Sequence, residues 1–166
     1  MNWFLIILGF LVLQRLAELW LANRNTQRLM AEGAVEHGRE HYVLFVVLHT
    51  AWLAAMVLLA PEDPPFLPVL FTAFVLLQLG RVWVIATLGR YWTTRIIVPA
   101  SAPLITGGPY RWVKHPNYLV VIGEIAVVPL MAGMWELALV FSALNAALLW
   151  LRIGVENSTL KQRLKG

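Results

Sequence analysis

Long apolar runs separated by short polar or proline-rich segments dominate the pattern of this 166-residue chain. Each run is close to the length of about 20 residues that a helix needs to cross the hydrocarbon core of a bilayer. The five runs cover roughly residues 3–22, 42–60, 66–88, 117–133 and 135–151. A tight turn that contains Gly133 joins the last two. The pattern predicts an all-α integral membrane protein with five transmembrane helices, the last two forming a tight hairpin.

Composition supports this class. The chain is 60% hydrophobic and 13% charged, whereas soluble domains are about half apolar and about a quarter charged. The length suits a single membrane-embedded domain, residues 1–166. The chain has no Cys, which excludes a disulfide framework and thiolate chemistry. No cation precedes Arg15, so we expect the first run to remain as a span and not to be a cleavable signal.

The distribution of cations predicts an orientation. All 13 Lys and Arg residues lie in or beside the segments that follow the first, third and fifth runs. The opposite side carries only acidic side chains, which are Glu62, Asp63 and Glu136. The positive-inside rule then places the N-terminus outside and the C-terminus in the cytoplasm. We expect a multi-pass protein of the inner (cytoplasmic) membrane, surrounded by lipids, with an active site facing the cytoplasm and no nucleic-acid partner.

Three polar segments lie on the predicted cytoplasmic side. Residues 23–41 alternate charged and apolar positions at helical spacing, which predicts an interfacial helix. Residues 89–116 are rich in Gly and Pro and predict an ordered loop. Residues 152–166 are expected to continue the fifth span as a short amphipathic helix.

Polar side chains inside the spans are costly and usually face a cavity or a partner. They are Arg15, Glu18, His49, Gln78, Arg81, Glu124 and Asn145. Most fall in the predicted cytoplasmic half, which indicates a pocket open to the cytosol with Glu18, His49 and Glu124 in its wall.

Plainer interpretations of these side chains remain open. Arg15 and Glu18 can pair along one helix face, and Arg81 can extend to the interface. His49 can be a packed, hydrogen-bonded residue, and Asn145 can bond between helices. Glu124 is harder to explain in this way, because no cation lies close to it in the sequence.

A cationic and aromatic patch covers residues 111–118, just before the fourth run. Pro116 suits the first position of a helix, with His115 at its cap. The helix amides, with Arg111 and Lys114, would favour an anion, and Asn117 and Tyr118 can add hydrogen bonds or stacking. A plain positive flank of a span would explain the two cations but not the His-Pro-Asn-Tyr that follows.

A second pair follows the fifth run. Arg152 and Glu156 are four residues apart and share a helix face. They can form a simple surface pair, or Glu156 can bind the ammonium group of a ligand at the cytosolic mouth of the pocket.

At these two motifs the chain resembles the isoprenylcysteine carboxyl methyltransferase family of membrane methyltransferases. The motifs read Gly-Pro-Tyr-Arg-Trp-Val-Lys-His-Pro-Asn-Tyr over residues 108–118 and Arg-Ile-Gly-Val-Glu-Asn-Ser-Thr-Leu over residues 152–160. Asn157 replaces a second Glu of the family pattern. The first half, around residues 15–19 and 33–42, is similar to a bacterial branch. Some members of that branch accompany type III polyketide synthases and are thought to methylate alkylpyrones or alkylresorcinols.

The resemblance implies S-adenosylmethionine as cofactor and O-methyl transfer to a lipophilic acceptor that arrives from the bilayer. The cofactor motifs lie in residues 104–160. The residues expected to bind the cofactor are Lys114, His115, Pro116, Asn117, Tyr118 and Glu156. Arg152 or Arg95 is expected to orient the acceptor oxyanion, so Arg152, Glu156 and Arg95 are the catalytic candidates, and no metal is expected.

The acceptor stays open at this stage. A prenylcysteine-like carboxylate is already ionised and needs no base, whereas an ordinary phenol would need one, with His49, Glu18 or Glu124 as candidates. Alkylpyrone and alkylresorcinol hydroxyls are the other acceptors that the resemblance suggests. Two rival functions are an NADPH-dependent membrane reductase with a related His-Pro-Asn-Tyr hairpin and a small transporter or scaffold. The concentration of polar residues toward one side argues against transport, and the oligomeric state is open.

Overall fold

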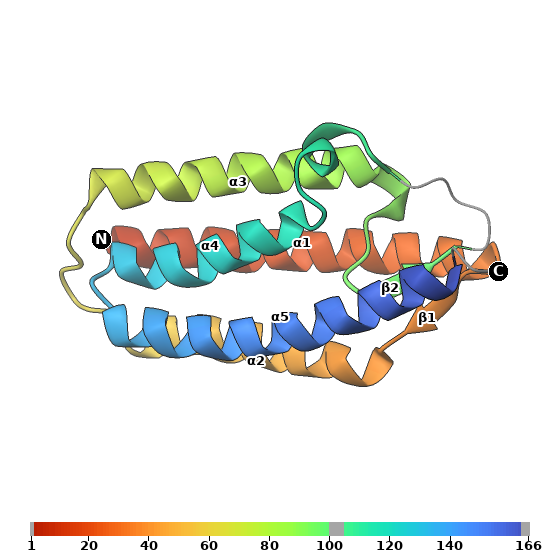
Figure 1. The fold of residues 1–166 in the computed structure, drawn as a ribbon. Coiled ribbons are helices and arrows are strands. Elements are labelled where there is room, and N and C mark those ends of the chain that lie inside the picture. The colour runs from red at the N-terminus through yellow and green to blue at the C-terminus, as the bar shows by residue number, and fades with distance from the viewer. Residues whose placement is uncertain (1, 100–104, 164–166) are drawn as a thin grey trace.

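A computed structural model of the chain describes residues 2–99 and 105–163, in which five α-helices run along a common axis (Figure 1). The N-terminal end of the described chain and its C-terminal end lie at opposite ends of the bundle. The helices are α1 (Trp3–Ala31), α2 (Arg39–Leu58), α3 (Pro68–Leu88), α4 (Pro116–Met131) and α5 (Trp135–Arg163). The minor elements are two short 3-10 helices, η1 (Gly89–Tyr91) and η2 (Gly108–Arg111), and two strands, β1 (Val35–His37) and β2 (Ile96–Val98).

Four segments are long and apolar enough to cross a membrane. They are Trp3–Ala31, His41–Leu58, Pro68–Tyr91 and Trp135–Glu156. The class predicted from the sequence, an all-α membrane protein, is therefore confirmed. The fourth predicted span corresponds to α4, which has 16 residues. At 1.5 Å per residue it is about 24 Å long, less than the hydrocarbon thickness of about 30 Å.

The interfacial helix expected over residues 23–41 is wrong. Instead α1 continues to Ala31, where Gly33 adopts φ +86° and ends it. The amides of Gly33 and Ala34 donate to the carbonyls of Met30 and Leu29, each at 3.0 Å, which is the Schellman arrangement. The chain then forms β1, and α2 begins at Arg39.

The ordered loop predicted over residues 89–116 contains more regular structure than its composition suggests. It includes η1, β2 and η2, while residues 100–104 lie outside the described residues. β2 pairs with β1 in antiparallel register, with Glu36 opposite Ile97. This pairing ties the segment after α1 to the segment after α3 at one end of the bundle (Figure 1).

The largest hydrophobic core lies toward the other end of the bundle, near the start of α1. It joins all five helices and the turn after α4 and is made of Phe4, Leu8, Leu11, Trp52, Met56, Phe74, Ile125, Val128, Met131, Ala132 and Leu137. Close approach of α3 and α4 adds to it, because a Cβ added at Gly123 would lie 2.6 Å from Leu77 Cδ2. The larger apolar core therefore fixes one end of the bundle, and a smaller one, made of Ala22, Val84 and Trp92, lies toward the other end.

The connection from α4 to α5 is short. α4 ends at Met131 and α5 begins at Trp135, with Gly133 at φ +77° between them. The helix predicted for the tail is confirmed as far as Arg163, because α5 continues without a break through residues 152–163. Residues 164–166 of that tail lie outside the described residues. α4 begins well short of the end of the bundle that α1 and α5 reach (Figure 1).

Candidate functional site

The two sequence motifs meet in a polar cluster of four side chains: His115, Tyr118, Arg152 and Glu156. The Tyr118 hydroxyl donates to the Glu156 carboxylate and accepts from Arg152 Nε at 2.8 Å. His115 Nδ1 lies 3.3 Å from Glu156 Oε2, and Arg152 Nε lies 3.5 Å from Glu156 Oε1. The start of α4 and the last part of α5 are thus joined through one carboxylate.

Several elements hold this polar cluster in place. The His115 and Tyr118 rings stack with centroids 5.2 Å apart. Arg152 Nη2 donates to the Thr94 carbonyl at 2.9 Å, and the guanidinium lies 5.2 Å from the centre of the Phe45 ring on α2. No sequence signal pointed to Phe45 or Thr94, because a ring face and a backbone carbonyl leave no motif. Arg152 is thereby held by the Tyr118 hydroxyl, the Thr94 carbonyl and the Phe45 ring.

Asn117 presents an unsatisfied acceptor at the same place. Its Oδ1 atom is buried and has no hydrogen-bond partner among the described residues. A buried carbonyl oxygen without a donor is costly, so a ligand with an N–H or O–H group would stabilise it. Pro116 is buried at the first helical position, and the amides of Tyr118 and Leu119 donate to the His115 carbonyl. These two amides are therefore already used within the protein.

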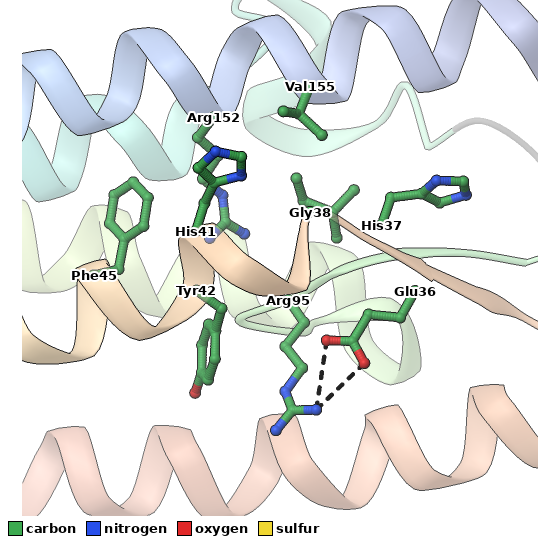
Figure 2. A pocket seen from close by; sticks show the side chains of 10 residues that line it. Glu36, His37, Gly38, His41, Tyr42, Phe45, Arg95, Arg152 and Val155 are labelled. Atoms are coloured by element: carbon green, nitrogen blue, oxygen red, sulfur yellow. Dashed lines mark hydrogen bonds and ion pairs between the residues drawn. The ribbon is translucent and has the colours of Figure 1, made fainter.

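Other residues expected at the site lie elsewhere. Lys114 is exposed. Arg95 lies 3.4 Å from the Glu36 carboxylate and over the Tyr42 ring, in a small recess between β1, the start of α2 and α5 (Figure 2). Arg152 also lines this recess, which connects Arg95 with the polar cluster. The side chain of Asn157 lies outside the described residues.

Tyr110, in η2, is a further residue near the polar cluster. Burial, with a smaller contribution from the Glu156 charge, raises the pKa of Tyr110 to about 12. Two residues before it in the same motif, Gly108 has φ +56°, and a Cβ there would lie 2.4 Å from Thr87 Oγ1 on α3. The Gly-Pro-Tyr part of the motif therefore packs against the end of α3.

A cavity of about 910 Å³, counting the space at its open mouth, extends from the polar cluster into the bundle. Asn117, Tyr118 and Arg152 lie in its wall. Its apolar wall comes from four helices and includes Leu19, Val46, Leu53, Val121 and Leu149. An elongated apolar molecule with one polar end would match this lining.

A buried ion-pair network lies beside the cavity and is centred on Glu124. This carboxylate accepts from Arg81 Nε at 3.0 Å, from Gln78 Nε2 at 2.9 Å, and from terminal nitrogens of Arg81 and Arg15. Arg81 is 1% exposed and Glu124 2%. The expectation that Arg81 extends to the interface is wrong, because two buried carboxylates hold it inside the bundle.

Glu18 completes the network. It accepts from Arg15 at 2.7 Å, from Gln14 at 3.1 Å and from Arg81 at 3.4 Å. The pairing of Arg15 with Glu18 expected from their spacing is confirmed. Arg15, Glu18 and Arg81 line the cavity, while Glu124, among the described residues, is not part of the cavity wall.

His49 also lines the cavity, from α2. Its Nδ1 atom lies 2.8 Å from the Phe45 carbonyl, one turn back on the same helix. Asn145 is 1% exposed on α5, and its Oδ1 atom has no partner among the described residues. That oxygen therefore makes no bond between helices in the described part of the chain.

These features define an all-helical membrane protein with a polar cluster at the mouth of an apolar cavity. The model of the Isoprenylcysteine carboxyl methyltransferase (ICMT) family matches residues 69–162, more than half of the chain. The chain belongs to this family of membrane methyltransferases. The match includes the polar cluster and the Glu124 side of the network.

Two bacterial relatives extend the similarity over nearly the whole chain. "Uncharacterized protein YpbQ" of Bacillus subtilis (strain 168) is 37% identical over 163 residues, which cover 96% of this chain and 97% of the relative. An uncharacterized protein of Haemophilus influenzae (strain ATCC 51907 / DSM 11121 / KW20 / Rd) is 26% identical over 155 residues, covering 88% of each chain. No solved structure matches this chain.

Proposed function

We propose that this protein transfers a methyl group from S-adenosylmethionine to an oxygen atom of a lipophilic acceptor. The observation that carries the proposal is the convergence of His115, Tyr118, Arg152 and Glu156 in one cluster. Two of its members, Tyr118 and Arg152, line a cavity with apolar walls. This placement supports a water-soluble polar ligand at the mouth and an apolar ligand inside the cavity. Membership of the methyltransferase family supports the reaction.

The residues at the mouth fit the chemical groups of this cofactor. Glu156 supplies a carboxylate for the ammonium group, and the stacked His115 and Tyr118 rings supply an aromatic surface. Asn117 Oδ1 is a buried acceptor without a donor among the described residues. When bound, the cofactor supplies an electrophilic methyl group. The exposed Lys114 would act on the cofactor only through its charge.

The chain's own contribution is positioning and exclusion of water. Methyl transfer from a sulfonium to an oxyanion removes two opposite charges, so a poorly solvated cavity favours it. Arg152, held by the Thr94 carbonyl and the Phe45 ring, would orient the acceptor oxygen. Arg95, paired with Glu36 in the adjoining recess, would act on Arg152 and the acceptor from farther away. The apolar wall would hold the alkyl chain.

In this proposal all five helices cross the membrane, the N-terminus is outside, and the polar cluster faces the cytoplasm. The cations of the described segments after α1 and α3 and in the last part of α5 support this orientation. The acceptor would diffuse from the bilayer between the helices. Its reacting group would be a prenylcysteine-like carboxylate or the hydroxyl of an alkylpyrone or alkylresorcinol.

Ligand binding tests the proposal directly. S-adenosylhomocysteine should raise the unfolding temperature of the purified protein in detergent, and NADPH should not. His115→Ala should abolish this shift while expression and the ligand-free unfolding temperature stay near those of the wild type. His37→Ala serves as the matched control, because the His37 ring points away from Arg95 and Arg152 (Figure 2). Wild-type-like affinity in His115→Ala, or stabilisation by NADPH instead, would contradict the proposal.

A further inference from the structure

The charges around the cavity are balanced within the protein. The three cations in its wall are Arg15, Arg81 and Arg152. Arg15 and Arg81 pair with Glu18 and Glu124, and Arg152 pairs with Glu156. Among the described residues, the cavity wall therefore has no unpaired cation that could bind a negatively charged acceptor. An acceptor that enters uncharged suits this lining better than one that enters as a carboxylate.

An uncharged hydroxyl needs a base, and the buried carboxylates are poor candidates. Glu124 accepts hydrogen bonds from Arg15, Arg81 and Gln78, and it is not part of the cavity wall. Glu18 accepts from two arginines and Gln14. The oxygens of both carboxylates already accept hydrogen bonds from these donors. Both are thus committed to the ion-pair network.

His49 is the remaining basic group of the cavity wall. The Phe45 carbonyl can only accept a hydrogen bond, so the proton of the neutral imidazole lies on Nδ1. Nε2 then carries the lone pair, and among the described residues it has no hydrogen-bond partner. The backbone of α2 thereby fixes the tautomer in which Nε2 can accept a proton from a molecule in the cavity.

The position of His49 relates it to the polar cluster. Arg152 lies over the Phe45 ring, and His49 follows Phe45 by one helical turn, which is about 6 Å along the axis. Tyr118, Arg152 and His49 line the same cavity. A hydroxyl group can therefore approach His49 while it remains near the mouth where the cofactor would bind.

We propose that His49 is the general base of the methyl transfer and that the acceptor is an amphiphile with a weakly acidic hydroxyl group, a phenol or an enol. This inference rests on the proposed function. The acceptor O–H bond breaks and its proton goes to His49 Nε2. The acceptor oxygen bonds to the methyl carbon of the sulfonium donor as the carbon–sulfur bond breaks, and that electron pair stays on the sulfur, which becomes a thioether.

The experiment compares His49→Gln with wild type and with the matched control His37→Gln, using full-length protein in lipid nanodiscs with S-adenosylmethionine. Two of the acceptors carry the same long alkyl chain. The first is an alkylphenol, with a hydroxyl pKa of about 10, and the second is its nitro derivative, which is largely ionised at neutral pH. A fatty carboxylate of matched length is the third substrate.

His49→Gln should lower kcat/KM for the alkylphenol by about 10² or more and leave the value for the nitrophenol within a few-fold of wild type. His37→Gln should match wild type on both acceptors. An equal loss on the phenol and the nitrophenol would show a structural role and overturn the inference. No loss on the phenol, or a clear wild-type preference for the fatty carboxylate, would also overturn it.

Two further measurements separate this inference from the proposed function. S-adenosylhomocysteine should stabilise His49→Gln as much as wild type. If it did not stabilise the wild type, the proposed function itself would be contradicted. Nitrogen-15 NMR of histidine-labelled protein should show an unprotonated Nε2 resonance that His49→Gln removes and that shifts when the alkylphenol is added. A protonated Nε2 in the free protein at neutral pH would overturn the role of His49 alone.

Discussion

Arg15 on α1 and Glu124 on α4 are 109 residues apart in the sequence and form an ion pair inside the helical bundle. Glu124 also binds Arg81 of α3, so one carboxylate connects three helices. Ionised groups in a low-dielectric interior are stable only with such partners. The network therefore determines both the packing of α1, α3 and α4 and the polarity of the cavity beside them.

Removing the central charge of this network should destabilise the protein strongly. Among the described residues, Glu124→Gln leaves Arg15 and Arg81 with Glu18 as their one charged partner, and breaking a buried pair in this way costs about 3–5 kcal/mol. Glu32→Gln is the control, because its pair with Arg90 is about half exposed and is expected to contribute less than about 1 kcal/mol. Denaturant unfolding in mixed micelles measures the free energy of unfolding of both variants. Equal losses of stability in Glu124→Gln and Glu32→Gln would contradict a special role of the buried network.

The contact between α3 and α4 gives a prediction about packing. Gly123→Ala places a methyl group 2.6 Å from Leu77 Cδ2 and should cost about 1–3 kcal/mol through overpacking. Gly80→Ala, where the added methyl group would lie 3.5 Å from Val120 Cγ2, should be neutral or slightly stabilising. Gly123→Ala should therefore unfold at a lower temperature than the wild type, and Gly80→Ala at the wild-type temperature or slightly above it. A tolerated Gly123→Ala would mean that α3 and α4 lie farther apart.

The hydroxyl of Tyr118 should matter more for ligand binding than for folding. Tyr118→Phe removes an acceptor for Arg152 and a donor to Glu156 while it keeps the ring that stacks on His115. Hydrogen bonds to charged groups contribute about 1.5–3 kcal/mol, so affinity for S-adenosylhomocysteine should fall about tenfold or more. Isothermal titration calorimetry measures the change, with Tyr91→Phe as control. Unchanged affinity would show that the hydroxyl only supports the fold.

The environment of Tyr110 predicts a pH dependence. Its pKa is about 12 in the folded protein, against a usual value of 10, so the folded state favours the neutral phenol. This stabilisation is complete below pH about 10 and is lost as the pH rises through about 12. Absorbance titration of tyrosinate should show that Tyr110→Phe removes ionisation mainly from the upper part of this range. Loss of a signal near pH 10 instead would contradict the burial of this hydroxyl.

The features that the sequence could predict are local or periodic. Apolar run lengths predicted the class of protein, and a spacing of three residues predicted the Arg15–Glu18 pair. The two motifs of the polar cluster were recognisable because each lies within a short stretch of chain. Their meeting through Glu156 follows from the short connection between α4 and α5.

The features that the sequence could not predict depend on distant partners. Arg81 is 43 residues from Glu124, and no period in the chain connects them, so the sequence alone does not predict this ion pair. β1 and β2 have three residues each, too few to show the alternation typical of a strand. The bond from His49 to the Phe45 carbonyl is local, but only the folded cavity shows why the other ring nitrogen matters.

The brevity of α4 has a consequence for the lipids around the protein. A helix of 16 residues between neighbours of 20 to 29 residues matches a thin bilayer better than a thick one. In the proposed topology, in which α4 crosses the membrane, phospholipids would compress, or water would enter, where α4 begins. In that topology a water-soluble donor and an apolar acceptor could reach the same depth without a moving gate, and the acyl-chain length of the lipids would be expected to affect turnover.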